Sequence, residues 1–344
     1  MYIEINNKYR PYIAQWLLVM FFLVSIMIII GGLTRLTDSG LSITEWEFFK
    51  GFFPPVSKST WIEYFEAYKK IPEFQLQNFG MSLGEFKVIF WWEWFHRFFG
   101  RLIGLCFLLP LIYFSFKIKL INLLHYYFIF LLICFQGFIG WYMVSSGLVD
   151  RVDVSHYRLS AHLLIAFLIL SLILWNYLKL IKIKSTLNKL NPIIPLLFII
   201  LIFTQIVIGA FVSGMDAGKI YNSWPLMGNS YFPDDNNIIN LFKLSAFNDP
   251  SLVQFIHRNL AYIIVIFYLF IVYKIYKAKM FGLYKSVNLL GILLIFQIIL
   301  GIVTVLHGAQ IYIASVHQIS SIFLVSACIY FYFINTKSNL QPSN

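Results

Sequence analysis

The chain of 344 residues is 60% hydrophobic and only 12% charged, with a formal net charge of +11. Soluble domains are about half apolar and about one quarter charged, so this composition excludes an ordinary soluble protein. Three cysteines without a CxxC spacing also argue against a disulfide framework or a cysteine metal site. We expect Cys106, Cys134 and Cys328 to pack as small apolar side chains.

Apolar runs recur along the sequence, each close to the roughly 20 residues that a helix needs to cross about 30 Å of hydrocarbon. They predict eight transmembrane helices, over residues 12–32, 88–114, 122–144, 159–178, 193–213, 252–273, 288–307 and 314–334. The first run is too long for a signal-peptide core and lacks a small-x-small cleavage site, so we expect it to stay as a helix. The predicted fold class is an all-α integral membrane protein.

The charges are divided unevenly between the two sets of connecting segments. With the N-terminus on the inner side, the inner segments hold 13 basic residues and one acid, Glu4, whereas the outer segments hold 13 basic residues and 14 acids. This distribution follows the positive-inside rule and predicts that both termini are cytoplasmic. The positive charge therefore reports membrane orientation, and nucleic acid is excluded as a partner.

The sequence contains an internal repeat. At an offset of 178, residues 28–31 match 206–209 and Trp46 matches Trp224. Motifs of later helices recur at an offset of 161: Phe95-His96-Arg97 with Ile256-His257-Arg258, and Phe135-Gln136 with Phe296-Gln297. The repeat predicts two parallel, pseudo-symmetric four-helix bundles, over residues 1–184 and 185–344.

Four of the seven histidines lie near the outer ends of the even-numbered predicted helices: His96, His162, His257 and His317. By helical rise they fall at similar depths in the outer half of the bilayer, two in each half of the chain. A neutral imidazole is a good axial ligand for haem iron, and two at one depth can clamp one haem. A hydrogen-bonded role between helices is the alternative, but ionisable residues inside a membrane are usually functional, and repeated pairs favour haem.

The other three histidines do not fit that pattern. His125 begins the third predicted helix at its inner end, His156 falls in a predicted loop, and His307 is at an outer helix end where the repeat has Ser146. We expect these three to have structural or local polar roles.

Arginines directly follow a candidate ligand in both halves. Arg97 and Arg258 are positioned to pair with haem propionates, since a guanidinium can bind a carboxylate through two hydrogen bonds. Arg35 and Arg101 are weaker candidates of the same type. The alternative role is that of an interfacial anchor whose charge extends toward lipid headgroups.

One acidic residue breaks the repeat. Glu93 lies three positions before His96, on the same helical face, whereas the equivalent position holds the neutral isostere Gln254. We favour a functional acid over an interfacial residue in an aromatic belt. Gln136 and Gln297 recur in helices that would flank a haem, where they could bind porphyrin edges or neighbouring helices. The nearby glycines Gly140 and Gly301 are expected to allow close approach of a helix or a flat ring.

Two predicted outer loops, 33–87 and 214–251, are long and correspond in the repeat. Large structured loops on one face often cover a functional site. They could equally cap the bundles at the membrane interface, and the sequence leaves both roles open.

Several motifs resemble those of the haem A synthase family. They are the run Gly31–Ser42 with Glu45-Trp46 and Pro54-Pro55, Glu93–Arg97 with Gly100-Arg101, Trp224–Met227, and Gln254–Arg258. The similarity covers essentially all eight predicted helices. Some members of the family carry a cysteine pair in the first outer loop, and this loop has none. The chain therefore resembles the cysteine-free subtype of proteobacteria and mitochondria.

The resemblance implies an oxidoreductase that converts the C8 methyl group of haem O to a formyl group, giving haem A for cytochrome oxidase assembly. His96 and His162 would bind the substrate haem O, and His257 and His317 would bind a haem b that relays electrons. Glu93 matches the catalytic acid of the family. The protein chiefly supplies position, ligands and proton control, because the oxidation belongs to the haem iron.

The resemblance also implies a location and partners. We expect a multi-pass protein of the bacterial inner (plasma) membrane, which works with membrane lipid, an electron donor and haem O synthase (protohaem farnesyltransferase). The sequence is compatible with a homo-oligomer. Two alternatives are a di-haem cytochrome b that transfers electrons from quinol and a haem carrier without catalysis. The first does not require Glu93 to differ from Gln254, and the second predicts loosely bound, exchangeable haem in both sites. A test for formyl haem by mass would separate both from the synthase.

Overall fold

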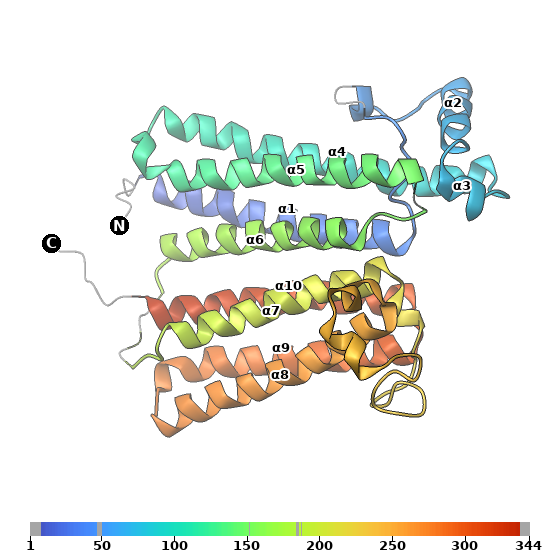
Figure 1. Ribbon diagram of the computed structural model, residues 1–344. Helices are drawn as coiled ribbons and strands as arrows, with labels where there is room; N and C mark the ends of the chain where they lie inside the picture. The colour runs from blue at the N-terminus through green and yellow to red at the C-terminus, as the bar shows by residue number, and fades with distance from the viewer. Residues whose placement is uncertain (1–7, 47–49, 151, 184–185, 187, 338–344) are drawn as a thin grey trace. The chain divides into compact units, whose positions relative to one another are not determined.

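A computed structural model describes residues 8–337 apart from 47–49, 151, 184–185 and 187 (Figure 1). Eight of its helices are long and apolar enough to span a membrane: α1 (Arg10–Leu36), α4 (Leu83–Ser115), α5 (Leu124–Asp150), α6 (His156–Leu180), α7 (Ile193–Gly214), α8 (Pro250–Lys277), α9 (Tyr284–Leu306) and α10 (Ile311–Thr336). Within the described residues no β-strand is formed. The predicted all-α membrane fold with eight spanning helices is confirmed.

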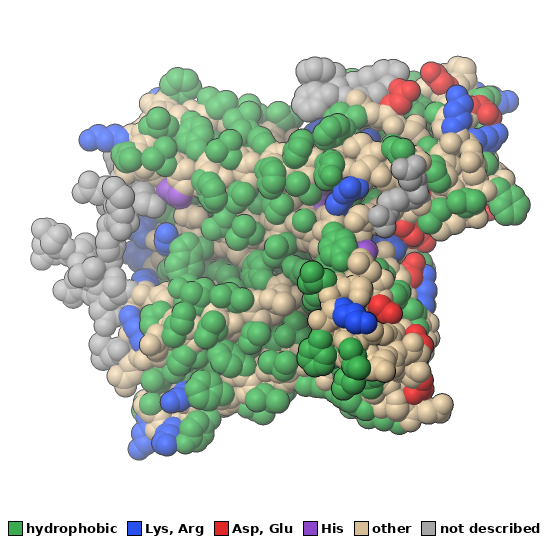
Figure 2. All heavy atoms as spheres, in the orientation of Figure 1, with side chains coloured by type: hydrophobic (Ala, Val, Ile, Leu, Met, Phe, Trp, Pro, Cys, Tyr) green, Lys and Arg blue, Asp and Glu red, His purple; other side chains and the backbone are tan. Residues whose placement is uncertain are grey.

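The outward faces of the helices are apolar. Large side chains such as Phe22, Val88 and Ile266 are 57%, 59% and 67% exposed. Figure 2 shows hydrophobic side chains over the middle of the helices of each unit, with acidic side chains gathered at the end that carries the long loops. Apolar patches of this extent are rare on soluble monomers, and here they are the surface that lipid would cover.

Six of the spanning helices begin earlier than their apolar runs predict, and α4 and α6 show why. α4 begins at Leu83, five residues before the predicted start, because Ser82 and Glu85 form a capping box: Ser82 Oγ accepts from Glu85 N at 3.3 Å, and Glu85 Oε2 accepts from Ser82 N at 2.8 Å. α6 begins at His156, so the prediction that this residue lies in a loop is wrong. Hydropathy marks only the apolar part of a helix and misses a polar first turn.

The helices form two compact units. Among the described residues, the first unit comprises 19–169 and the second comprises 8–18 and 170–337. In the first unit α4 packs on α5, and in the second α7 packs on α8 and α9 on α10. The repeat predicted two halves, 1–184 and 185–344. Their pseudo-symmetry, and the haem that each would hold, stay predictions.

The long loop of the first unit is itself folded. It contains η1 (Lys50–Phe52), α2 (Lys58–Tyr68) and α3 (Pro72–Leu76). Trp61 and Phe65 of α2 pack edge-to-face and tilted against Phe90 and Phe86 of α4, with ring centroids 4.9 and 5.0 Å apart. This aromatic cluster attaches the loop to the first part of α4, about two to three turns before His96.

The long loop of the second unit is built from short turns. It contains η3 (Ala217–Lys219), η4 (Ile238–Phe242) and η5 (Leu244–Asn248), while η2 (Leu120–Asn122) and η6 (Phe281–Leu283) lie in short connections elsewhere. Asp249 caps α8 by accepting a hydrogen bond from Leu252 N at 3.0 Å. Asp235 accepts a further bond from Ser251 Oγ at 2.7 Å. The loop is thereby fixed to the first turn of the helix that carries His257.

Candidate functional site

The imidazole of each of the four predicted ligand histidines packs against a glycine of the preceding spanning helix. The glycines are Gly31, Gly140, Gly209 and Gly301, which face His96, His162, His257 and His317 in that order. A Cβ added to each glycine would lie 2.9, 3.0, 3.0 and 3.1 Å from the imidazole Cε1 atom. Real Cβ atoms essentially never come closer than about 3.0 Å to another heavy atom, so the contact at Gly31 leaves no room for a Cβ, and at the other three the ring would have to move by a few tenths of an ångström.

The histidines form one pair in each unit. His96 and His162 lie close enough for their charges to interact, and so do His257 and His317. The buried Nδ1 atoms of His96, His162 and His257 have no hydrogen-bond partner. Buried polar atoms normally have one, so these unpaired nitrogens set the three histidines apart from ordinary residues between helices.

The donor set suits haem better than a metal bound by protein alone. In the described part of the chain no group of three or more His, Cys, Asp or Glu side chains could hold a metal ion. A pair of histidines supplies only axial ligands, which is sufficient for an iron that brings its own equatorial nitrogens. The residues present therefore fit one haem in each unit.

Two glutamines singled out in the sequence hydrogen-bond to the ligand helices. Gln136 Nε2 donates to the backbone oxygen of His162 at 3.0 Å, and Gln297 Nε2 donates to that of His317 at 3.0 Å. Of the two roles expected for them, the structure shows the bond between helices. Contact with a porphyrin edge stays a prediction.

A third glutamine was not predicted. Gln205 Nε2 donates to the backbone oxygen of His257 at 3.0 Å and lies 3.3 Å from His257 Nε2. It precedes Gly209 by four residues, the same spacing that separates Gln136 from Gly140. This spacing could have identified it, but its counterpart at the repeat offset of 178 is Met27, so the repeat itself gave no signal.

Glu93 is the centre of a buried polar network. It is 3% exposed, and its Oε2 accepts hydrogen bonds from Ser42 Oγ at 2.7 Å and Ile43 N at 2.8 Å. Its Oε1 accepts from Arg97 Nη2 at 2.5 Å. Three converging donors, one of them charged, suit a negatively charged acceptor. The network joins the first outer loop to α4 one turn from His96.

The equivalent network in the second unit has the opposite direction. Gln254 Nε2 donates to the backbone oxygen of Tyr221 at 3.0 Å, and Tyr221 is the counterpart of Ile43 at the repeat offset of 178. The acid accepts a hydrogen bond from a backbone N–H, whereas the amide donates one to a backbone carbonyl. Glu93 and Gln254 therefore differ in charge and also in the direction of the hydrogen bond that each makes with the loop backbone.

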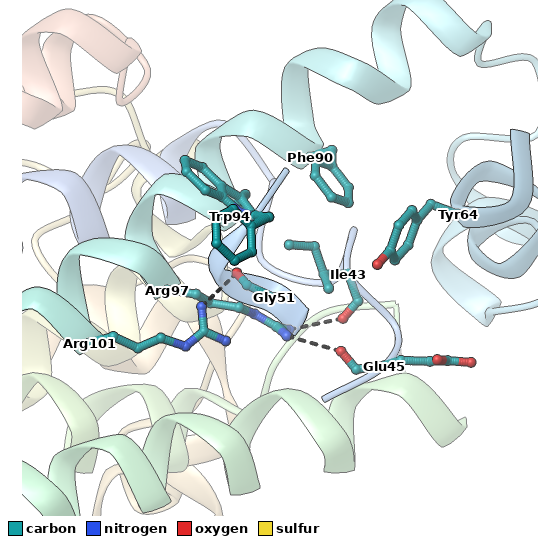
Figure 3. A pocket seen from close by; sticks show the side chains of 9 residues that line it. Ile43, Glu45, Gly51, Tyr64, Phe90, Trp94, Arg97 and Arg101 are labelled. Carbon is teal, nitrogen blue, oxygen red and sulfur yellow. Dashed lines mark hydrogen bonds between the residues drawn. The ribbon is translucent and has the colours of Figure 1, made fainter. Parts of the chain in front are cut away.

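The two predicted propionate-binding arginines hold loop carbonyls. Arg97 Nη2 donates to Ile43 O at 2.9 Å and Arg97 Nη1 to Glu45 O at 3.4 Å, as Figure 3 shows. Arg258 donates to Tyr221 O and Ser223 O, both at 2.9 Å. These arginines fasten the long loops to α4 and α8, the helices that carry His96 and His257, and propionate binding stays a prediction for both.

The weaker arginine candidates have similar contacts. Arg101 Nη1 donates to Gly51 O at 2.9 Å, and in Figure 3 this side chain and Arg97 extend from α4 toward the loop. They line a small pocket with Ile43, Glu45, Gly51, Phe53, Tyr64, Phe90 and Trp94. Arg35 Nη1 lies 2.6 Å from Asp38 Oδ1 and 3.8 Å from Asp153 Oδ1, so Arg35 forms ion pairs with acids of the loops.

A second buried acid was missed. Glu73 of α3 is 3% exposed, and its Oε2 has no hydrogen-bond partner. Burial first, and then the negative charges of Glu93, Asp153 and Asp38, raise the pKa of this carboxyl to about 8. A glutamate in a polar loop gives no sequence signal of burial, so only the packing of α3 reveals it.

Known proteins resemble the chain over nearly its whole length. A family model described as cytochrome oxidase assembly protein matches residues 14–329, a range that contains all four histidines predicted to be ligands. A protein named Heme A synthase from Pelagibacter ubique (strain HTCC1062) is 49% identical over 338 residues, 97% of this chain and 99% of its own. Proteins of the same name from Rickettsia bellii (strain RML369-C) and Parvibaculum lavamentivorans are 44% and 43% identical, covering 93% and 92% of this chain and 97% and 92% of their own.

Proposed function

The chain belongs to the haem A synthase family of cytochrome oxidase assembly proteins, and we propose that it oxidises the C8 methyl group of haem O to the formyl group of haem A. Family membership confirms the predicted class, an oxidoreductase of haem biosynthesis in a multi-pass membrane protein. The two alternatives, a di-haem electron-transfer cytochrome and a haem carrier, are not favoured by the relatives.

The first unit is the site of oxidation in this proposal. His96 and His162 would hold haem O, and His257 and His317 would hold a haem b that relays electrons. The observation that supports this division is the network around Glu93: its unit has a buried carboxylate with three donors, where the other has the neutral Gln254. A site that only transfers electrons has no need of an acid.

The residues of the first unit have separable roles. A bound haem iron supplies the oxidation chemistry. The glycine contacts restrain the rings of His96 and His162, which would hold and orient the haem. Glu93 places a fixed negative charge one turn from His96, where it can stabilise positive charge on the substrate or accept a proton at Oε1. Arg97 holds that carboxylate and the loop above it, which limits the access of water.

The cellular setting follows from the reaction. We place the chain in the bacterial inner membrane with both termini cytoplasmic, in agreement with the charge distribution. Its substrate would come from haem O synthase, the protohaem farnesyltransferase. The oxidation also requires an electron donor, and haem b is the group that would exchange electrons with it.

Product analysis tests the proposal directly. The chain is expressed with haem O synthase in a bacterium that lacks its own haem A synthase, and the haems are extracted and identified by mass. The formyl product should appear only when the chain is present. Recovery of haem O alone would contradict the proposal: it would indicate a carrier if the haem is loosely held, or an electron-transfer cytochrome if the purified protein oxidises quinol.

A further inference from the structure

Three of the four histidine–glycine contacts are reinforced by a glutamine. Gln136, Gln205 and Gln297 each precede the contact glycine by four residues, and each donates from Nε2 to the backbone oxygen of the facing histidine at 3.0 Å. The fourth contact, between Gly31 and His96, has Met27 in the same position of the helix. One ligand of the four is therefore held by a different kind of interaction.

Met27 holds the helix position that the glutamines hold elsewhere, four residues before the glycine. It is half-buried, and its Cε lies 3.5 Å from where a Cβ would be on Gly100, one turn after His96 on α4. The thioether thus packs against the ligand helix. It has no N–H to donate to the backbone oxygen of His96.

The two kinds of contact resist separation differently. A hydrogen bond between helices in apolar surroundings opposes opening, because an opened pair leaves a buried donor without a partner. Gln205 and Gln297 also lie 3.3 Å from a ring nitrogen of their histidines, which restrains the ring itself. A methionine contact is non-directional and adapts to a shifted neighbour. At the level of the histidine, the α1–α4 contact is therefore the one of the four that no glutamine holds; Glu93 and Arg97, within one turn of His96 on α4, bind the loop after α1.

An enzyme that uses one haem as substrate and another as prosthetic group needs the two sites to differ in how easily they release haem. A prosthetic haem stays bound, whereas a haem that is a substrate must enter and leave in every cycle. We propose that Met27 makes His96 the releasable ligand of the substrate haem, so that haem O enters and haem A leaves by opening the contact between α1 and α4. The proposal rests on the assignment of the substrate to the first unit, and it adds which of the two ligands lets go.

Haem exchange measures this without requiring catalysis. The purified chain is loaded with haem b at both sites, mixed with excess apomyoglobin, and the transfer of haem is followed by absorbance. We expect a fast phase from the first unit and a slow phase from the second. Met27→Gln should slow the fast phase by about threefold to tenfold, the size expected of one hydrogen bond between helices, and leave the slow phase unchanged.

A matched control and a reciprocal variant keep the test decisive. Ile26→Gln places the same side chain at the preceding position, which is 44% exposed. The rates of both phases of haem transfer should then stay as they are in the native chain. Gln205→Met should instead accelerate the slow phase, with a change in the low-spin spectrum of that haem. Equal rates for Met27→Gln and the native chain, or no acceleration by Gln205→Met, would overturn the proposal.

The outcome is independent of the proposed reaction. If Met27→Gln slows exchange while no haem A can be made by the native chain, the releasable ligand stands and the oxidation is wrong. If haem A is made but exchange is unaffected, the oxidation stands and this inference fails. Should Met27→Gln prevent loading of the first unit, the acceleration by Gln205→Met decides the result.

Discussion

Arg97 Nη2 lies 2.5 Å from Glu93 Oε1, across one turn of α4. The same guanidinium donates to the carbonyls of Ile43 and Glu45, while Ile43 N donates to the other carboxylate oxygen. The acid, the outer loop and the helix of His96 are therefore held as one unit, and changes to this pair should affect the reaction before they affect the fold.

The first prediction concerns the charge of Glu93. Glu93→Gln should preserve folding and the haem b signal but reduce the formation of haem A by about 100-fold or more, because the fixed charge beside the substrate is lost. Extracted haems identified by mass should contain haem O, with hydroxylated intermediate if the reaction stalls midway. Normal formation of haem A would reduce Glu93 to a residue that holds the loop.

The reciprocal variant is the control for that experiment. Gln254→Glu would direct a carboxylate at the backbone oxygen of Tyr221, where an amide N–H now donates at 3.0 Å. Two acceptors facing each other destabilise the contact, so the haem b spectrum should change first. A loss of haem A with an intact haem b spectrum would contradict the assignment of the two units.

The second prediction concerns the ligands of haem b. His257→Ala or His317→Ala should remove the six-coordinate, low-spin haem b signal or convert it to a five-coordinate one, since each residue is one of two axial ligands. Absorbance and electron paramagnetic resonance spectra of the purified variants measure this. If both variants kept an unchanged low-spin spectrum, these two residues could not be the pair.

The third prediction tests the glycine contacts. Gly140→Ala places a methyl group 3.0 Å from the Cε1 atom of His162, so the ring must shift by a few tenths of an ångström and haem binding to the first unit should weaken. Gly137→Ala on the same helix is the matched control, because no atom lies within 4 Å of its added Cβ. Haem content per protein distinguishes the two, and equal contents would refute the contact.

The fourth prediction is a pH dependence of stability caused by Glu73. Its carboxyl has a pKa of about 8 in the folded chain and 4.5 in the unfolded one. From about pH 4.5 to 8 the unfolded state releases this proton while the folded state keeps it, so the free energy of unfolding falls as the pH rises. At roughly 1.4 kcal/mol per unit of pKa, the loss reaches a few kcal/mol above pH 8.

A neutral variant should remove that loss. Glu73→Gln is expected to match the native melting temperature near pH 4.5 and to exceed it increasingly up to pH 8. Glu66→Gln, a change to an exposed carboxyl paired with Lys69, should give no such trend. A parallel pH dependence of the native chain and Glu73→Gln would show that Glu73 ionises normally.

The fifth prediction concerns orientation. The charge split predicts cytoplasmic termini, so a reporter fused after Asn344 should be active only when the assay reads the inner compartment. A reporter inserted into the loop 214–251 should behave in the opposite way. Activity of the C-terminal fusion on the outer side would contradict either the orientation or the count of eight spans.

The sequence predicted the features that depend on long-range patterns. Hydropathy located the eight spans, and the spacing of histidines selected four residues that all occupy the same kind of contact with a glycine. It could not show how Arg97 and Arg258 use their donors, because a guanidinium suits a propionate and a loop carbonyl equally well. It also missed Gln205, whose partner at the repeat offset is Met27, and Glu73, whose burial depends on the tertiary packing of α3.

The length of α4 has a mechanical consequence. Its 33 residues extend for about 50 Å, well beyond the roughly 30 Å of hydrocarbon, because the Ser82 cap starts the helix early. One continuous helix thus carries the aromatic anchors of the outer loop, Phe86 and Phe90, and the ligand His96. A displacement of the loop must turn or tilt this helix as a whole, so a substitution at Trp61 of the loop should be detectable as a change in the axial ligand field of the substrate haem.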